Sequence, residues 1–189
     1  MAHGAEEAQN LRELLERGQK NGVTGLEILD KTALKKIEPN LADDVTSALY
    51  APTGGIVCPF QLTIAAIGNA MDNGAELFTS FAVRSAKKTQ TGWKIFAKDG
   101  RELEAKIIVN CAGYGTAEIA RLFGDDSFEI GARKGEYILL DKSCAAFVHH
   151  TVFGLPTAAG KGVLVSPTVD GNILVGPTSV EEDTYDTST

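Results

Sequence analysis

The sequence predicts an α+β fold: a mainly antiparallel sheet with flanking helices, a small meander, and one strand of a parallel sheet. Residues 5–19 place leucines at helical spacing among charged residues, which indicates an amphipathic helix. Two Asp-Gly pairs between apolar segments indicate antiparallel hairpins. The apolar run at 107–111 ends just before Gly113, a pattern typical of a strand buried on both faces of a parallel sheet.

Length and composition limit the size of the fold, its binding partners and its cellular setting. The 189 residues suffice for one domain or one large lobe with a core of its own. A net charge of −7 argues against a surface that binds a nucleic-acid backbone. Three widely spaced cysteines form no disulfide framework, so we expect a reduced, cytoplasmic setting. No apolar run approaches the roughly 20 residues that a membrane span requires, so we expect no transmembrane segment.

The first quarter of the chain is expected to contain two helices and two extended segments. The helix at 5–19 ends at an Asn-Gly pair, because glycine suits the position that follows a helix. Residues 23–29 are expected to be extended. A second helix at 30–37 begins with an aspartate, a favoured N-cap, and ends at Glu-Pro-Asn. Residues 47–51 are expected to form a strand.

The middle of the chain is expected to form a helix, a meander and a second helix. A loop rich in glycine and proline at 52–59 leads into a helix at 60–71. The face of that helix expected to be buried consists of Leu62, Ala65, Ala66 and Ala70. Strands are expected at 76–85, 93–97 and 102–110, the last two joined by a tight Asp-Gly turn. A helix at 116–123 follows the glycine turn.

The last third is expected to supply most of the antiparallel sheet. Strands are predicted at 133–141 and 147–153, followed by a flexible loop at 154–162, and then at 163–167 and 172–175 around a second hairpin turn. Residues 181–189 are acidic, polar and without pattern, so we expect a frayed tail.

Several residue groups are candidates for a phosphate, metal or nucleophilic site. Gly113 and Gly115 begin a dinucleotide fingerprint, but Glu118 occupies its third glycine position, so we expect no phosphate site there. A group of Asp141, Cys144, His149 and His150 matches no closed zinc pattern. We therefore expect no metal, and adjacent histidines on a strand would point to opposite faces, one of them toward a pocket. Cys58 precedes a proline and has no evident partner base.

Basic residues offer a candidate anion site. Arg133 and Lys134 begin a predicted strand, and Lys161 lies between two glycines on a loop. Such a lysine suits the capture of a phosphate or carboxylate. An ordinary solvated charge explains each of these residues equally well.

The segments together resemble a known family. The run GGIVCPFQLTIAAIGNAMDNGAEL, a tryptophan-bearing hairpin and IIVNCAG resemble flavoproteins of the D-amino-acid-oxidase superfamily. Downstream, RKGEYILLDK and GKGVLVSPTVDGNILVGPT are similar to bacterial FAD-dependent glycerol-3-phosphate dehydrogenases. The resemblance extends from about Leu14 to the acidic tail. Members begin with a GxGxxG segment that binds the ADP part of FAD, which is missing here, so we expect this chain to be an internal fragment of a larger enzyme.

The resemblance implies an architecture. Residues 1–75 and 126–189 would form most of a substrate lobe, and 76–125 part of the FAD-binding domain, including the strand of its parallel sheet. Without the GxGxxG turn, the isolated chain is expected to bind FAD weakly or not at all and to be inactive. The apolar strand at 107–111 would then lack neighbours, and its exposed edge is expected to favour dimerisation.

The resemblance also implies roles by position. Val83, Ala112, Gly113, Gly55 and Ile56 match positions that lie against FAD. Weaker candidates for the substrate side, which would receive a small anion, are Arg133, Lys161, His149 and Phe153. No catalytic residue is assigned.

The activity implied is oxidation of sn-glycerol 3-phosphate to dihydroxyacetone phosphate by hydride transfer to FAD. An FAD-dependent oxidase of a 2-hydroxy acid, such as 2-hydroxyglutarate, or of an amino acid is a second interpretation. A non-catalytic binding module is a third, from a different class. The electron acceptor is left open between a quinone, another subunit and oxygen.

Overall fold

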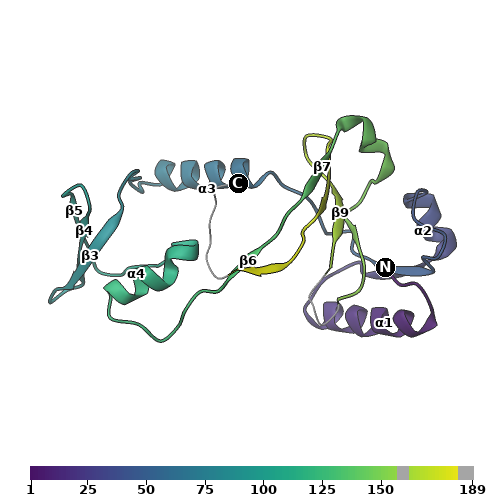
Figure 1. Ribbon diagram of the computed structural model, residues 1–189, viewed down its shortest axis with the longest axis horizontal. Coiled ribbons are helices and arrows are strands. Elements are labelled where there is room, and N and C mark those ends of the chain that lie inside the picture. The colour runs from purple at the N-terminus through teal and green to yellow at the C-terminus, as the bar shows by residue number, and fades with distance from the viewer. Residues whose placement is uncertain (157–161, 183–189) are drawn as a thin grey trace. The chain divides into compact units, whose positions relative to one another are not determined.

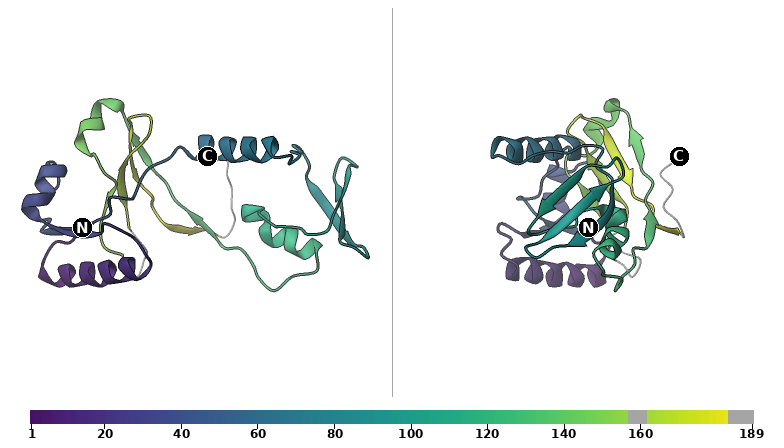
Figure 2. Two further views of the ribbon diagram at one scale, coloured as in Figure 1. Left: turned by 180° about the vertical axis from the view of Figure 1, so that it is seen from behind. Right: turned by 90° about the vertical axis from the view of Figure 1, so that its left-hand side faces the viewer.

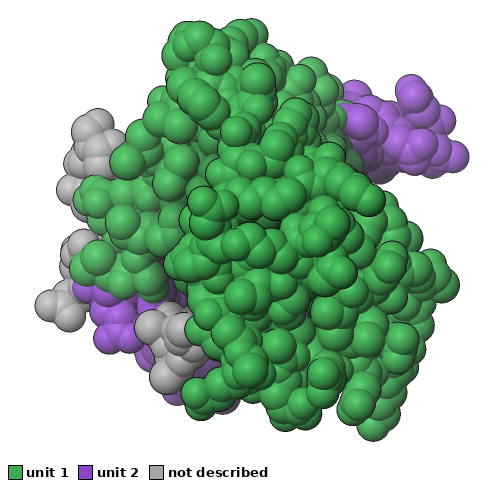
Figure 3. Space-filling model, turned by 90° about the vertical axis from the view of Figure 1, so that its right-hand side faces the viewer, with its two compact units in different colours: residues 1–64, 134–180 green, residues 65–133, 181–189 purple. Residues whose placement is uncertain are grey.

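The computed structural model describes residues 1–156 and 162–182. The chain divides into two compact units, shown in green and purple in Figure 3. Unit 1 comprises Met1–Ile64 and Lys134–Val180, and unit 2 comprises Ala65–Arg133 and Glu181–Thr189.

The helices are α1 (Ala5–Lys20), α2 (Lys31–Ile37), α3 (Pro59–Asp72) and α4 (Thr116–Leu122), with short 3-10 helices η1 (Gly113–Gly115) and η2 (Lys142–Phe147) (Figure 1). The strands are β1 (Glu27–Asp30), β2 (Ser47–Tyr50), β3 (Val83–Lys88), β4 (Trp93–Ala97), β5 (Glu102–Ala105), β6 (Ala132–Lys134), β7 (Ile138–Leu140), β8 (Val152–Phe153), β9 (Leu164–Pro167), β10 (Ile173–Gly176) and β11 (Val180–Glu182).

The first layer of unit 1 is the antiparallel β1–β2 hairpin, which both α1 and α2 contact. The carboxylate of Asp30 accepts a hydrogen bond from the backbone N–H of Ala33 at 2.8 Å and so caps the start of α2. Leu34, Val45 and Ala48 form the buried cluster between helix and hairpin. The two helices expected in this part of the chain are confirmed. They could be predicted because the residues that start, end and bury a helix lie close together in the sequence.

The second layer of unit 1 is a four-stranded antiparallel sheet in the order β7-β10-β9-β8. The β9–β10 turn closes through a hydrogen bond from Thr168 N–H to Asn172 O at 2.8 Å. Gly171 in this turn has a φ of 86°, which a residue without a Cβ adopts at low cost. The expected hairpin is thereby confirmed, and β8 lies at one edge of the sheet. Strands β6 and β11 form a separate two-stranded sheet.

Unit 2 contains the meander β3-β4-β5 with α4 against β3 (Figure 2). Ala97 N–H donates to Arg101 O at 2.9 Å across the turn at Asp99-Gly100, as the hairpin signal predicts. The rings of Trp93 and Phe123 meet edge to face with centroids 4.9 Å apart. This contact packs the end of α4 on the meander.

The buried strand expected at 107–111 is wrong. Strand β5 ends at Ala105, and residues 107–111 run outside regular structure. Ile107 and Val109 are 80% and 78% exposed. An apolar run forms a sheet strand only when neighbouring strands accept its backbone hydrogen bonds, and no described strand pairs with this segment.

The helix expected at 60–71 is confirmed as α3, but the burial expected for its face is wrong. Leu62, Ala65, Ala66 and Ala70 are all exposed, and so are Phe60 and Ile64. The apolar pattern of a helix shows which of its faces favours burial, whereas burial itself depends on a packing partner.

Three other strand predictions are too long. The segment 76–85 becomes a strand only at Val83, and 147–153 contributes only the two residues of β8. The segment 133–141 divides into β6 and β7 around Gly135, where an added Cβ would lie 2.9 Å from Pro177. Asp141 then starts η2 by accepting from Ser143 N–H at 2.9 Å. Within the described part of the chain, no helix combines the length and the apolar character needed to cross a membrane.

Candidate functional site

The candidate site is centred on a buried carboxylate at the end of α2. Glu38 is only 3% exposed, the one charged residue in this burial class among the described residues. Its backbone N–H donates to Leu34 O at 2.8 Å, so the last turn of α2 holds it in place. A buried carboxylate is costly unless hydrogen bonds replace its hydration. Its partners therefore indicate what this position is built to hold.

Those partners all come from residues 149 and 150, far along the chain. One Glu38 oxygen, Oε1, accepts from the backbone N–H of His149 at 2.8 Å and of His150 at 2.6 Å. The Nδ1 atom of His150 lies 2.7 Å from the same oxygen, and the His149 Nδ1 lies 3.6 Å from Oε2. Both imidazoles thus turn toward one carboxylate. The expectation that they point to opposite faces of a strand is wrong, because this segment bends instead of forming a strand.

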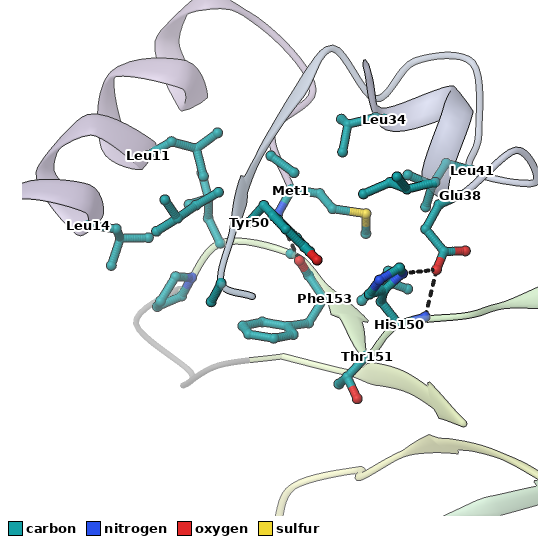
Figure 4. A pocket seen from close by; sticks show the side chains of 18 residues that line it. Met1, Leu11, Leu14, Leu34, Glu38, Leu41, Tyr50, His150, Thr151 and Phe153 are labelled. Carbon is teal, nitrogen blue, oxygen red and sulfur yellow. Dashed lines mark hydrogen bonds and ion pairs between the residues drawn. The ribbon is translucent and has the colours of Figure 1, made fainter. Parts of the chain in front are cut away.

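A cavity of about 280 Å³ opens beside this cluster (Figure 4). Its wall is mostly apolar and comes from α1, α2, β2 and residues 150–156. His150 and Thr151 add polar atoms to the wall, so one of the two histidines faces a pocket as expected. The His150 ring meets Tyr50 edge to face with centroids 5.8 Å apart. The site can enclose an apolar group beside a small polar cluster.

The N-terminus contributes to the same cavity. The Met1 amino group donates a hydrogen bond to Phe153 O at 2.8 Å (Figure 4). Burial lowers the pKa of this amino group, and the nearby Glu7 carboxylate partly opposes that shift. Ala2 forms an antiparallel bridge to Ser47, the first residue of β2.

The structure separates the expected substrate-side residues. Phe153 lies in β8 and lines the cavity, whereas His149 contacts Glu38 but does not line the cavity itself. Arg133 lies in β6, where its Nη2 pairs with Glu181 Oε1 at 2.6 Å. Lys161 lies outside the described residues. Among the residues that are described, no three His, Cys, Asp or Glu side chains gather as a metal site.

The residues expected to lie against FAD are accessible. In unit 2, Val83 begins β3 and is half-buried, while Ala112 and Gly113 are exposed. Asn110 shapes their turn, because its amide nitrogen donates to Thr116 O at 2.9 Å and its amide oxygen accepts from Ala112 N–H at 3.2 Å. This turn is therefore held by a side chain.

Glycine leaves free space at two of these positions. Gly113 has a φ of 58°, and no atom lies within 4 Å of the place where a Cβ would be. In unit 1, the exposed loop before α3 holds Gly55 and Ile56, and Gly55 has the same free space. A ligand can approach the backbone closely at both glycines.

Sequence reasoning did not assign a role to Glu38. The Glu-Pro pair at 38–39 indicates only the end of a helix, which the structure confirms. The carboxylate and its partners are 111 and 112 residues apart, and no spacing pattern links residues at that separation. The two adjacent histidines are the signal that the sequence offers, and they do not indicate their partner.

Comparison with known proteins gives a consistent answer. The family described as FAD dependent oxidoreductase matches residues 1–189. A glycerol 3-phosphate dehydrogenase of Caloramator mitchellensis is 40% identical over 177 residues, which cover 94% of this chain and 37% of that protein. An L-2-hydroxyglutarate dehydrogenase of Escherichia coli is 28% identical, over 92% of this chain and 41% of that protein.

The fold agrees with this match. The structure of an FAD-bound L-alpha-glycerophosphate oxidase from Mycoplasma pneumoniae superposes with a TM-score of 0.84 at 28% identity, over 99% of this chain and 51% of that one. The chain thus spans between about a third and a half of the length of these proteins. Because the family match extends over every residue and includes a relative at 40% identity, the chain belongs to the FAD-dependent oxidoreductases of the D-amino-acid-oxidase family.

Proposed function

We propose that the enzyme to which this chain contributes oxidises sn-glycerol 3-phosphate to dihydroxyacetone phosphate, with FAD as the hydride acceptor. The observation that carries this proposal is the 40% identity to a glycerol 3-phosphate dehydrogenase over 94% of the chain. The fold shared with an FAD-bound glycerophosphate oxidase supports the same substrate. The L-2-hydroxyglutarate dehydrogenase is less similar, at 28%, and supports the second candidate, oxidation of a 2-hydroxy acid.

The residues of this chain fit a role beside FAD. A rigid, planar group can approach the backbone closely at Gly113 and Gly55, because no atom occupies the place of a Cβ there. The side chain of Asn110 holds the turn that contains Gly113 in a fixed shape. Val83 and Ala112 would contact the cofactor next to Gly113, and Ile56 next to Gly55. FAD, when bound, supplies the electron chemistry, while the protein supplies position and electrostatics.

The substrate lobe would comprise most of residues 1–75 and 126–189, and residues 76–125 would belong to the FAD-binding domain. Phe153 and His149, with Arg133 and Lys161, are proposed on the substrate side. Arg133 already has a carboxylate partner in Glu181, so anion binding by Arg133 would require that pair to open. A cytoplasmic location is proposed because all three cysteines are free thiols.

The test uses the full-length, FAD-loaded protein without oxygen. We expect sn-glycerol 3-phosphate to bleach the oxidised flavin spectrum and L-2-hydroxyglutarate to leave it unchanged. Bleaching by L-2-hydroxyglutarate alone would establish the second candidate and refute the first. The 189-residue chain should purify without stoichiometric flavin, since it carries no GxGxxG turn, and a yellow preparation would contradict that expectation.

A further inference from the structure

A short edge strand leads the chain past the cavity. Strand β8 has two residues, Val152 and Phe153, and among the described strands it pairs with β9 alone. So few ladder hydrogen bonds define its position weakly, and an edge strand of this length needs other restraints. Its second residue, Phe153, lines the cavity and is one of the proposed substrate-side residues.

The end of α2 supplies restraints immediately before this strand. Glu38 receives three hydrogen bonds from His149 and His150, as described above. Two residues later, the Asn40 amide nitrogen donates to Ala146 O at 3.3 Å and Phe147 O at 3.2 Å. The helix end therefore holds residues 146–150 at two points. We call this contact the α2 clamp.

Glu38 is the stronger half of the clamp. It is buried, and hydrogen bonds to a charged acceptor are stronger than those between neutral groups. Asn40 is exposed, and both of its contacts are longer. Two other hydrogen bonds between described residues restrain the segment near β8: Thr151 Oγ1 and Ser166 Oγ lie 2.6 Å apart, and the Met1 amino group donates to Phe153 O at 2.8 Å. The first bond ties Thr151 to β9 and the second ties Phe153 to the N-terminus, whereas the clamp ties residues 146–150 to the end of α2.

We propose that Glu38 is a positioning residue of the enzyme, which fixes the backbone of residues 149–153 so that Phe153 meets the substrate in one geometry. This proposal rests on the proposed function, because it assigns β8 to the substrate side. Glu38 belongs to the wall of the cavity, but its carboxylate bonds to His149 and His150, so we assign its effect to the segment that it holds. A segment that is less firmly positioned binds the substrate less tightly, because part of the binding energy is then spent on ordering the segment.

The test compares full-length, FAD-loaded variants. Glu38→Gln keeps the side-chain volume and one acceptor oxygen but removes the charge, so the hydrogen bonds from residues 149 and 150 are no longer charge-assisted. His150→Phe keeps an aromatic ring at this position and the backbone N–H bond to Glu38, but removes both imidazole nitrogens, including the Nδ1 that bonds Glu38. The matched control is Glu102→Gln, an exposed glutamate of unit 2 whose carboxylate pairs with Lys94 at 2.6 Å. Each variant is measured for KM, kcat, melting temperature, flavin spectrum and amide hydrogen exchange.

For Glu38→Gln we expect about tenfold faster exchange of the amides of residues 149–153 and about a tenfold higher KM, as loss of a charge-assisted hydrogen bond implies. The kcat should stay within about threefold, and the flavin spectrum should not change, because the reacting groups remain. His150→Phe should change exchange and KM in the same direction by less. Glu102→Gln should match the parent enzyme in every measurement.

Two results would overturn the proposal. One is unchanged exchange at 149–153 in Glu38→Gln. The other is a uniform loss of protection and melting temperature with the parent KM, which would make Glu38 a general stabilising residue. Failure of the proposed function looks different: the parent itself would be inert toward sn-glycerol 3-phosphate. In that case KM is compared with a hydroxy acid that does reduce the flavin. The comparison of amide hydrogen exchange needs no substrate and is made in the same way.

Discussion

Two isoleucines of the four-stranded sheet provide a sharp test of where the core of unit 1 lies. Ile173 in the central strand β10 is 1% exposed, whereas Ile138 in the neighbouring strand β7 is 63% exposed. The same substitution, Ile→Ala, at both positions removes the same atoms and the same strand preference. The difference between their effects therefore reports burial alone.

The expected magnitudes follow from these exposures. Ile→Ala removes three carbons, worth about 2.4 kcal/mol at about 0.8 kcal/mol for each carbon withdrawn from water. At Ile173 the full amount applies, and the cavity left behind raises the cost to about 3–4 kcal/mol. At Ile138 roughly a third of the side chain is withdrawn from water, so the loss should stay below about 1 kcal/mol.

Urea unfolding of the 189-residue chain, followed by circular dichroism, measures both values. Ile173→Ala should lower the free energy of unfolding by at least about 2 kcal/mol more than Ile138→Ala, with similar slopes against urea. Equal losses for the two variants would refute the assignment of the core to the inner face of β10. A loss below about 1 kcal/mol for Ile173→Ala would refute it as well.

Three further predictions test single features. Asp30→Ala should cost about 1 kcal/mol of stability in urea unfolding, because it removes the cap of α2, while Asp30→Asn keeps an acceptor and should cost less. Hydrogen bonds from Ser143 lower the pKa of Asp141, so its contribution is present above the unfolded pKa of about 3.9 and lost as pH falls through the folded pKa. Asp141→Asn should therefore flatten the acid side of the stability profile, and an unchanged profile would contradict this role. Light scattering should show self-association of the chain that Ile107→Lys with Val109→Lys abolishes, since both side chains are exposed; a monomeric parent would contradict this prediction.

Much of the local structure could be predicted from the sequence. The helices α1, α2, α3 and α4 and the turns at Gly100 and Gly171 lie where the sequence places them. Each depends on signals within a few residues: apolar spacing, a capping aspartate, or a glycine that accepts a positive φ. The family resemblance was also readable, because it rests on short runs of residues in a fixed order.

Strand lengths could not be predicted, because a strand exists only where another strand pairs with it. The apolar run at 107–111 reads as a strand and is not one here, and 147–153 keeps only its last two residues. The helix α3 shows the same limit for burial, since its apolar residues are exposed in this chain. In each case the missing information is a partner distant in the sequence.

The sequence by itself determined the class of this protein, its helices and tight turns, and the family to which it belongs, because these depend on residues close together in the chain. The tertiary structure decided which surfaces are buried and which side chains meet. Glu38 is the clearest example. Its neighbours in the chain mark only the end of a helix, whereas folding brings it to His149 and His150 and converts a helix terminus into the support of an edge strand.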